Sequence, residues 1–120
     1  MRVPVAPLAT LPPGTTAVFA VEVDGLPDAA FAVRLPSGEL RGYVNRCRHA
    51  NLPLDWADGR FLDPRGLLLC RAHGALYDPA DGRCVGGPCL GKSLRPVRLE
   101  VEGDLVVATA VASPATPGTP

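Results

Sequence analysis

The chain has two histidines, and each of them follows a cysteine at short spacing. The first motif is Cys47-Arg48-His49, and the second is Cys70-Arg71-Ala72-His73. Two thiolates and two imidazoles from two loops can close around a single metal centre. A fold that carries such a centre must hold two loops side by side, and this requirement restricts the architecture more than any other feature of the sequence.

The rest of the chain alternates short apolar segments with turn residues, and helical periodicity is nearly absent. Dipeptides such as Asp24-Gly25 and Asp81-Gly82 indicate tight turns. Strands are expected at Thr16–Val23, Ala30–Leu35, Leu40–Val44, Arg60–Asp63, Gly66–Cys70, Ala75–Asp78, Val97–Val101 and Leu105–Ala110. This pattern predicts an all-β fold.

The two motifs lie where the strand pattern fails. Residues 45–59 are expected to form a loop that contains the first motif, and Cys70 stands where a strand gives way to a second loop. Trp56, together with Leu54, is expected to cover the first loop or to pack beneath it. Two loops that rise from neighbouring hairpins would present the four side chains together.

The length and charge of the chain limit what can surround the centre. The chain has 120 residues and suits one domain, with an extended N-terminal segment (residues 1–14) and a disordered tail (residues 112–120). Twelve basic residues balance twelve acidic ones, so no net field favours nucleic acid or an anionic membrane as partner. No uninterrupted apolar stretch resembles a signal peptide or a membrane span of ~20 residues. The chain is therefore expected to be soluble and cytoplasmic.

Two kinds of metal centre use this donor set. A structural zinc site also takes two cysteines and two histidines, but zinc fingers usually place a cysteine pair before a histidine pair. Here each loop contributes one cysteine and one histidine, in the same order. This division lets one metal take both thiolates and a second metal take both imidazoles, as in a Rieske [2Fe–2S] centre.

The motifs and their surroundings resemble the Rieske [2Fe–2S] domain family. CRH followed by CRAH is similar to the family's CxH and CxxH pair, and Cys70–Asp78 (CRAHGALYD) is similar to its second loop. Asp78–Cys89 (DPADGRCVGGPC) resembles the Gly/Pro-rich loop that covers the cluster. The resemblance implies an antiparallel β-sandwich or barrel base within residues 15–111, with a cluster-binding subdomain of two loops at about residues 45–89.

The resemblance also implies the ligands of one [2Fe–2S] cluster per chain. Cys47 and Cys70 would bind one iron as thiolates, and His49 and His73 would bind the other iron. Neutral imidazoles leave the cluster less negative than four thiolates would, which raises its reduction potential.

Two departures from the respiratory members of the family follow from single residues. Those members carry a serine and a tyrosine after the second ligand histidine, whereas the matching residues here are Ala75 and Tyr77. Hydrogen bonds to sulfur stabilise the reduced state, so the missing serine predicts a low-to-intermediate potential. Respiratory members also join their two loops by a disulfide, and the corresponding residues here are Leu52 and Ala72.

Other side chains near the motifs have several possible roles. Cys84 and Cys89 could be buried small residues, a local disulfide or, least simply, metal ligands. Arg48 and Arg71 could be ordinary solvated residues, or they could steer the acidic docking face of a redox partner. The acidic residues of this region are expected at turns and on the surface: Asp55, Asp58, Asp63, Asp78 and Asp81.

The sequence indicates a carrier rather than an enzyme, because it contains no nucleophile paired with a base, no phosphate-binding loop and no room for a substrate domain. The hypothesis is a soluble Rieske-type ferredoxin that carries single electrons from a reductase to an oxygenase or a similar terminal enzyme. A second hypothesis is a Rieske-like small subunit of a larger redox enzyme, such as nitrite reductase. A third is a zinc-stabilised interaction domain.

Overall fold

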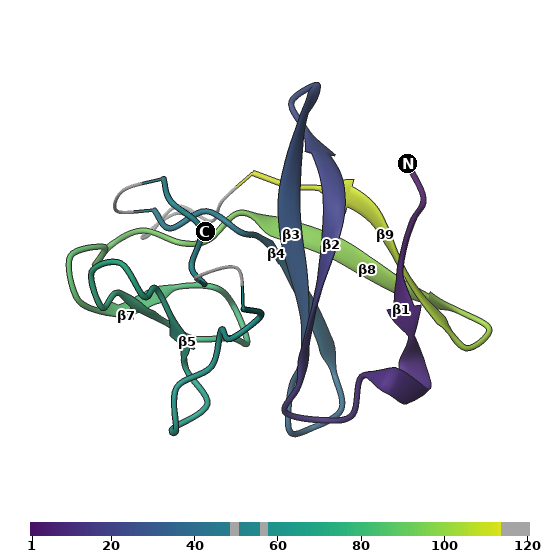
Figure 1. Ribbon diagram of the computed structural model, residues 1–120, viewed down its shortest axis with the longest axis horizontal. Helices are drawn as coiled ribbons and strands as arrows, with labels where there is room; N and C mark the ends of the chain where they lie inside the picture. Colours follow the sequence, from purple (N-terminus) through teal and green to yellow (C-terminus); the bar gives the residue numbers. More distant parts are fainter. Residues whose placement is uncertain (49–50, 56–57, 114–120) are drawn as a thin grey trace.

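The structure is a computed structural model that describes residues 1–48, 51–55 and 58–113. Within these residues, strands form a six-stranded antiparallel sheet in the order β1-β9-β8-β4-β3-β2 and a three-stranded sheet in the order β5-β6-β7 (Figure 1). The elements are β1 (Val3–Pro7), a 3-10 helix η1 (Leu8–Thr10), β2 (Thr16–Val23), β3 (Leu26–Arg34), β4 (Leu40–Val44), β5 (Leu68–Leu69), β6 (Leu76–Tyr77), β7 (Cys84–Gly86), β8 (Pro96–Glu102) and β9 (Leu105–Val111).

Local turn chemistry defines the long hairpin β2–β3. Asp24 and Gly25 both have positive φ angles, 51° and 83°, and they connect the paired residues Val23 and Leu26. Two such residues form the tight turn whose twist matches that of antiparallel strands, and Gly25 adopts it without steric cost. The register of β2 against β3 follows from this turn.

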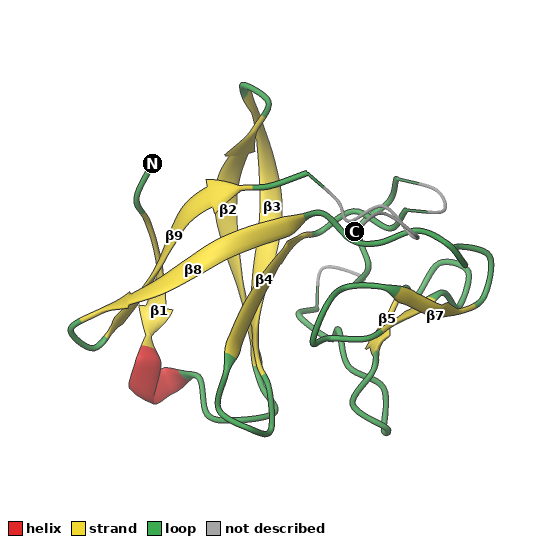
Figure 2. Cartoon of the chain, turned by 180° about the vertical axis from the view of Figure 1, so that it is seen from behind, coloured by secondary structure: helices red, strands yellow, loops and turns green. Residues whose placement is uncertain are grey.

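The smaller sheet belongs to an insertion in the larger one. Strands β4 and β8 are neighbours in the large sheet, and residues 45–95 leave the sheet after β4 and return before β8 (Figure 2). The Val44 N–H donates to the Arg95 carbonyl at 2.9 Å, which holds the two ends of the insertion together. Gly42 is required nearby, because a Cβ there would lie 2.7 Å from the Val97 carbonyl oxygen.

Alternate residues of β3 serve two separate cores. Ala30 and Ala32 pack into the core of the large sheet, which curls into a barrel-like base. Phe31 and Val33 face the insertion, and the Phe31 ring stacks on Phe61 with centroids 4.2 Å apart. The barrel therefore supports the insertion directly through packed side chains. The all-β prediction and the predicted sandwich or barrel base are confirmed.

Two strand predictions have exact bounds, and most others overlap a strand with different bounds; β3, for example, begins at Leu26 rather than at Ala30. β2 and β4 have the predicted bounds, whereas the predicted strand at Arg60–Asp63 is wrong, because only Leu62 forms a bridge, to Leu68. The Asp63 carboxylate accepts the N–H groups of Arg65 and Leu67 at 2.9 Å and closes a turn there. Backbone hydrogen bonds from the Asp63 N–H to the Leu67 carbonyl and from the Leu69 N–H to the Phe61 carbonyl still join the two sides of this turn.

The N-terminal segment, predicted to be extended, joins the large sheet. Residues 1–14 contain β1, which pairs with β9 at the edge of the large sheet. Pro4 and Pro7 obscure this strand in the sequence, although an edge strand tolerates proline because one of its sides makes no ladder hydrogen bonds. Residues 114–120 of the predicted tail lie outside the described residues. In the described part of the chain, no helix has the length and apolar character needed to cross a membrane.

Candidate metal centre

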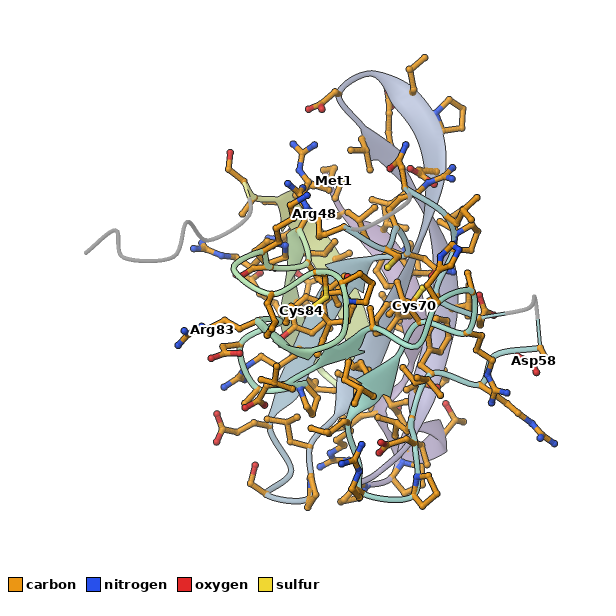
Figure 3. All side chains as sticks on the ribbon, turned by 90° about the vertical axis from the view of Figure 1, so that its left-hand side faces the viewer. Met1, Arg48, Asp58, Cys70, Arg83 and Cys84 are labelled. Carbon is orange, nitrogen blue, oxygen red and sulfur yellow. A yellow bond between two sulfur atoms is a disulfide. The ribbon has the colours of Figure 1, made fainter. Side chains whose placement is uncertain are left out.

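The two cysteines of the motifs meet in the core of the insertion. Cys47 follows β4, Cys70 follows β5, and both side chains are buried. Besides burial, the side chain of Cys47 is one of the causes that raise the pKa of the Cys70 thiol, so the two thiols lie close together. The Arg71 N–H donates to the Leu54 carbonyl at 2.9 Å, so a backbone hydrogen bond also joins the two loops. Figure 3 views this end of the molecule, with Cys70 near its middle.

The second loop is a tight turn built around the sulfur of Cys70. The Gly74 N–H donates to the Cys70 carbonyl at 2.9 Å, and the Cys70 N–H donates to the Ala75 carbonyl at 2.8 Å. Burial raises the pKa of the Cys70 thiol, while hydrogen bonds from the N–H groups of Ala72 and His73 act in the opposite direction. Backbone donors aimed at a buried sulfur suit a thiolate whose charge a metal ion compensates.

The first loop rests on a buried polar pair. The Asn45 amide donates to the Asp55 carboxylate at 3.0 Å, and the Asn45 side-chain oxygen accepts the Leu54 N–H at 2.8 Å. Asp55 also accepts the Gly59 N–H at 3.0 Å. Asp55 is thus a buried structural residue, which corrects the expectation of a surface position. Buried carboxylates need such partners, and only the folded loop supplies them.

The other four acidic residues expected at turns do lie there. Each accepts a backbone N–H two residues ahead, in the pattern of an Asx turn. These residues are Asp58, Asp63, Asp78 and Asp81.

Tyr77 connects the sulfur of Cys47 to the backbone. Its hydroxyl lies 3.2 Å from the Cys47 sulfur and accepts the Arg48 N–H at 3.0 Å. Burial raises the pKa of Tyr77, so the phenol keeps its proton. Because the oxygen already accepts the Arg48 N–H, the hydroxyl proton is available to the sulfur. Tyr77 is therefore placed to donate a hydrogen bond to a thiolate at Cys47.

A third loop covers the second one. Cys84 and Cys89 form a disulfide with a Cα–Cα distance of 5.7 Å, and Cys84 and Cys89 are both buried. Gly87, between them, lies against the second loop, where an added Cβ would be 3.0 Å from the Ala75 Cα and 3.2 Å from the Gly74 carbonyl. Of the three possible roles of these two cysteines, the structure contains the disulfide.

The comparisons with known proteins agree with this geometry. The family model of the Rieske [2Fe-2S] domain matches residues 1–110. The chain belongs to the Rieske [2Fe–2S] domain family. The cofactor of this family is a [2Fe–2S] cluster, and the predicted family and cofactor are both confirmed. No curated protein sequence is similar enough to count as a match.

Several solved structures are similar to this Rieske domain. The ferredoxin of carbazole 1,9a-dioxygenase from Nocardioides aromaticivorans IC177 is 29% identical with a TM-score of 0.66, over 94% of this chain and 98% of the ferredoxin. The terminal oxygenase of the same system is 24% identical with a TM-score of 0.67, over 89% of this chain and 29% of the oxygenase. A putative nitrite reductase NADPH small subunit is 15% identical with a TM-score of 0.61, over 92% of this chain and 99% of that subunit. The last two show the fold alone.

The residues of this Rieske domain fit the sulfur side of a cluster. Two buried thiols in mutual contact can share one iron, and His73 is exposed on the turn that carries Cys70. His49 and Trp56 lie outside the described residues, while Leu54 is buried beneath the first loop as expected. Among residues with a described position, no three His, Cys, Asp or Glu side chains are grouped to hold one ion. A Rieske centre requires two protein ligands per iron.

The two arginines of the motifs lie on different sides of the Rieske loops. Arg48 is exposed and borders a hollow of about 340 Å³ near the turn of β2–β3. Arg71 is half-buried and borders another hollow with Arg60 and Thr16, at the start of β2. In Figure 3, Arg48 lies above Cys70, whereas Asp58, which interacts electrostatically with Arg71, lies far to the right. One partner surface would have to be wide to contact both arginines.

Replacing Gly87 by alanine is expected to loosen the covering loop and to speed loss of the cluster. The φ angle of +84° strains any residue with a Cβ, and the new methyl would press on the backbone of Ala75. Gly91→Ala is a matched control, because Gly91 has a φ of +88° and nothing within 4 Å of an added Cβ. The measurement is the rate at which the visible absorption decays. Equal decay rates for the two variants would show that the Ala75 contact is unimportant.

Proposed function

We propose that this Rieske domain is an electron carrier, a soluble ferredoxin that takes single electrons from a reductase and passes them to a terminal oxygenase or a similar enzyme. The observation that carries the proposal is a buried pair of thiols, Cys47 and Cys70, beside the exposed imidazole of His73. A cluster held between them would be shielded on its sulfur side and accessible at its imidazole edge. An accessible edge shortens the path of an electron to a docked protein.

In the proposed site, Cys47 and Cys70 hold one iron, and His49 and His73 hold the other. The bound cluster supplies the uptake and release of one electron. The chain contributes the environment: Tyr77 donates a hydrogen bond to the Cys47 sulfur, and two backbone N–H groups donate to the Cys70 sulfur. Hydrogen bonds of this kind set the potential within the range of the family.

The proposed partners are a reductase and a terminal oxygenase. The similarity to the ferredoxin of a carbazole dioxygenase, which extends over nearly the whole of both chains, supports this choice. Arg48 and Arg71 are proposed as docking residues, one on each side of the loops, which would suit two partners better than one. The carrier is proposed to act in the cytoplasm and without catalysis of its own.

A second candidate function is a small subunit of a larger redox enzyme. The observation that favours this candidate is the similarity in fold to a putative nitrite reductase small subunit, over 99% of that chain. A subunit would be isolated in a stable, stoichiometric complex with a larger chain, whereas a carrier would be isolated alone. The mass of the native protein from its source cells distinguishes the two.

The purified protein is expected to be red-brown and to contain about two iron and two sulfide ions per chain. Reduction by one electron should produce the electron paramagnetic resonance signal of a Rieske centre, and a coulometric titration should give a one-electron step. A zinc-stabilised domain would instead be colourless and contain zinc alone. That result would refute the proposed function.

A further inference from the structure

The hollow beside Cys47 brings three arginines together. Arg46, Cys47, Arg48 and Asn51 of the first loop border it on one side, and Asp28 at the start of β3 and Arg95 before β8 border it on the other. Its volume of about 340 Å³ is that of a small ligand site rather than a packing defect. The hollow thus lies between the barrel and the loop that carries the first cysteine.

Two of the three guanidinium groups are held in place by carboxylates. Arg46 contacts both oxygens of Asp28 at 3.2 Å and donates to the Asn51 carbonyl. Arg95 forms a two-point ion pair with Asp24, with distances of 2.8 and 2.9 Å. Hydrogen bonds from Arg95 lower the pKa of Asp24, so this pair stays charged at neutral pH. These contacts position the guanidinium groups and consume most of their donors.

Arg48 is the third cation at this hollow. Among the residues with described positions, no carboxylate lies within ion-pair distance of its guanidinium. The charged lining therefore consists of three cations against Asp28, with Asp24 as a second anion behind Arg95. Among the described residues, the charged groups around the hollow leave an excess of one positive charge, and the exposed Arg48 lies at its border.

This chemistry matches one carboxylate on a short aliphatic stem. A guanidinium presents two parallel N–H donors to a carboxylate, and a single negative charge balances the excess. Val23 and Val44 supply apolar walls for the methylene groups. We propose that the hollow receives an acidic side chain of the redox partner that donates electrons to the carrier. This inference rests on the proposed function and names the chemistry of one partner.

The choice of the electron donor follows from the position of Cys47. Because Cys47 lines the hollow, a bound carboxylate adds negative charge next to the sulfur side of the cluster. Negative charge there disfavours the added electron, so the carboxylate binds the oxidised carrier more tightly than the reduced one. By reciprocity, binding lowers the potential. A reductase must bind the oxidised carrier and release the reduced one, which is the preference that this site produces.

The test uses the oxidised holoprotein and the peptide acetyl-Gly-Glu-Gly-amide, with its glutamine analogue as the neutral control. Calorimetry at constant ionic strength is expected to show weak binding of the glutamate peptide, with the glutamine peptide binding at least about tenfold more weakly. The glutamate peptide should bind the oxidised protein more tightly than the reduced protein. Arg48→Gln should weaken binding of the glutamate peptide at least about tenfold, and Arg48→Lys should weaken this binding less. Arg98→Gln removes the same charge from an exposed position on β8 and should leave binding of the glutamate peptide unchanged.

Each outcome decides the inference separately from the proposed function. Equal affinity of the two peptides, or equal losses in the Arg48→Gln and Arg98→Gln variants, would overturn the carboxylate site. Binding that is the same in both redox states would overturn the assignment to the electron donor. The absorption and paramagnetic resonance spectra are recorded first, so that a protein without a cluster refutes the proposed function, while calorimetry still tests the hollow.

Discussion

Replacing Cys70 by alanine is expected to abolish the cluster. The side chain is buried, contacts the thiol of Cys47 and accepts two backbone N–H groups. Removal of the sulfur deletes a proposed iron ligand and leaves both N–H groups without an acceptor. Loss of partners behind metal ligands already costs about 10–100-fold in affinity, and loss of a ligand itself should cost more. Iron content and the reduced-state paramagnetic resonance signal measure the effect.

The disulfide cysteines provide the matched control. Cys84→Ala combined with Cys89→Ala also removes buried sulfur from the insertion, but at the covering loop rather than between the two motif loops. This double variant should keep the cluster signal and lose only part of its thermal stability, since a short loop gains little from a disulfide. Retention of the full signal by the Cys70 variant would contradict the proposed ligand set.

The parts of this site that can be predicted from sequence depend on local chemistry. The tight turn at Asp24-Gly25 determines the register of the hairpin, so the predicted bounds of β2 match the observed ones. The spacing of the second motif, Cys70 to His73, is that of a tight turn that ends at Gly74. The turn from Cys70 to Gly74 has the hydrogen bonds that such spacing requires.

The parts that cannot be predicted depend on contacts between distant segments. Asp55 resembles a surface residue until the fold brings Asn45 to it. The sequence does not distinguish a disulfide between Cys84 and Cys89 from two buried thiols, because the packing of the covering loop against Ala75 is not visible in it. Likewise, the balanced composition of the chain conceals the hollow, whose arginines come from both ends of the insertion.

The topology explains why a barrel suits such a site. The insertion leaves and rejoins the large sheet at neighbouring strands, so its ends are fixed by one backbone ladder. Phe31 and Tyr43 of the barrel pack into the core that also contains Cys47 and Cys70. The sulfur side of the proposed site is thus held in a packed core, while His73 is exposed to solvent. This combination suits the electron carrier proposed above.

Replacing Tyr77 by phenylalanine is expected to lower the reduction potential. The hydroxyl lies 3.2 Å from the Cys47 sulfur, and its hydrogen bond strengthens as the cluster gains an electron. Its loss therefore destabilises the reduced state more than the oxidised state. A differential of about 1.5 kcal/mol, at the lower end of the usual range for a hydrogen bond to a charged group, corresponds to roughly 65 mV for one electron. A redox titration followed by absorption measures the shift.

Tyr43→Phe separates this effect from the loss of a buried hydroxyl. Tyr43 is buried in the same core, and its hydroxyl donates to the Pro79 carbonyl at 2.7 Å instead of to a motif cysteine. The Tyr43 variant should lose about 1 kcal/mol of stability with its one buried hydrogen bond, and the Tyr77 variant should lose more, because its hydroxyl makes two. Only the Tyr77 variant should shift the potential. Equal potentials in the two variants would mean that the hydroxyl of Tyr77 orders the Arg48 backbone without tuning the sulfur.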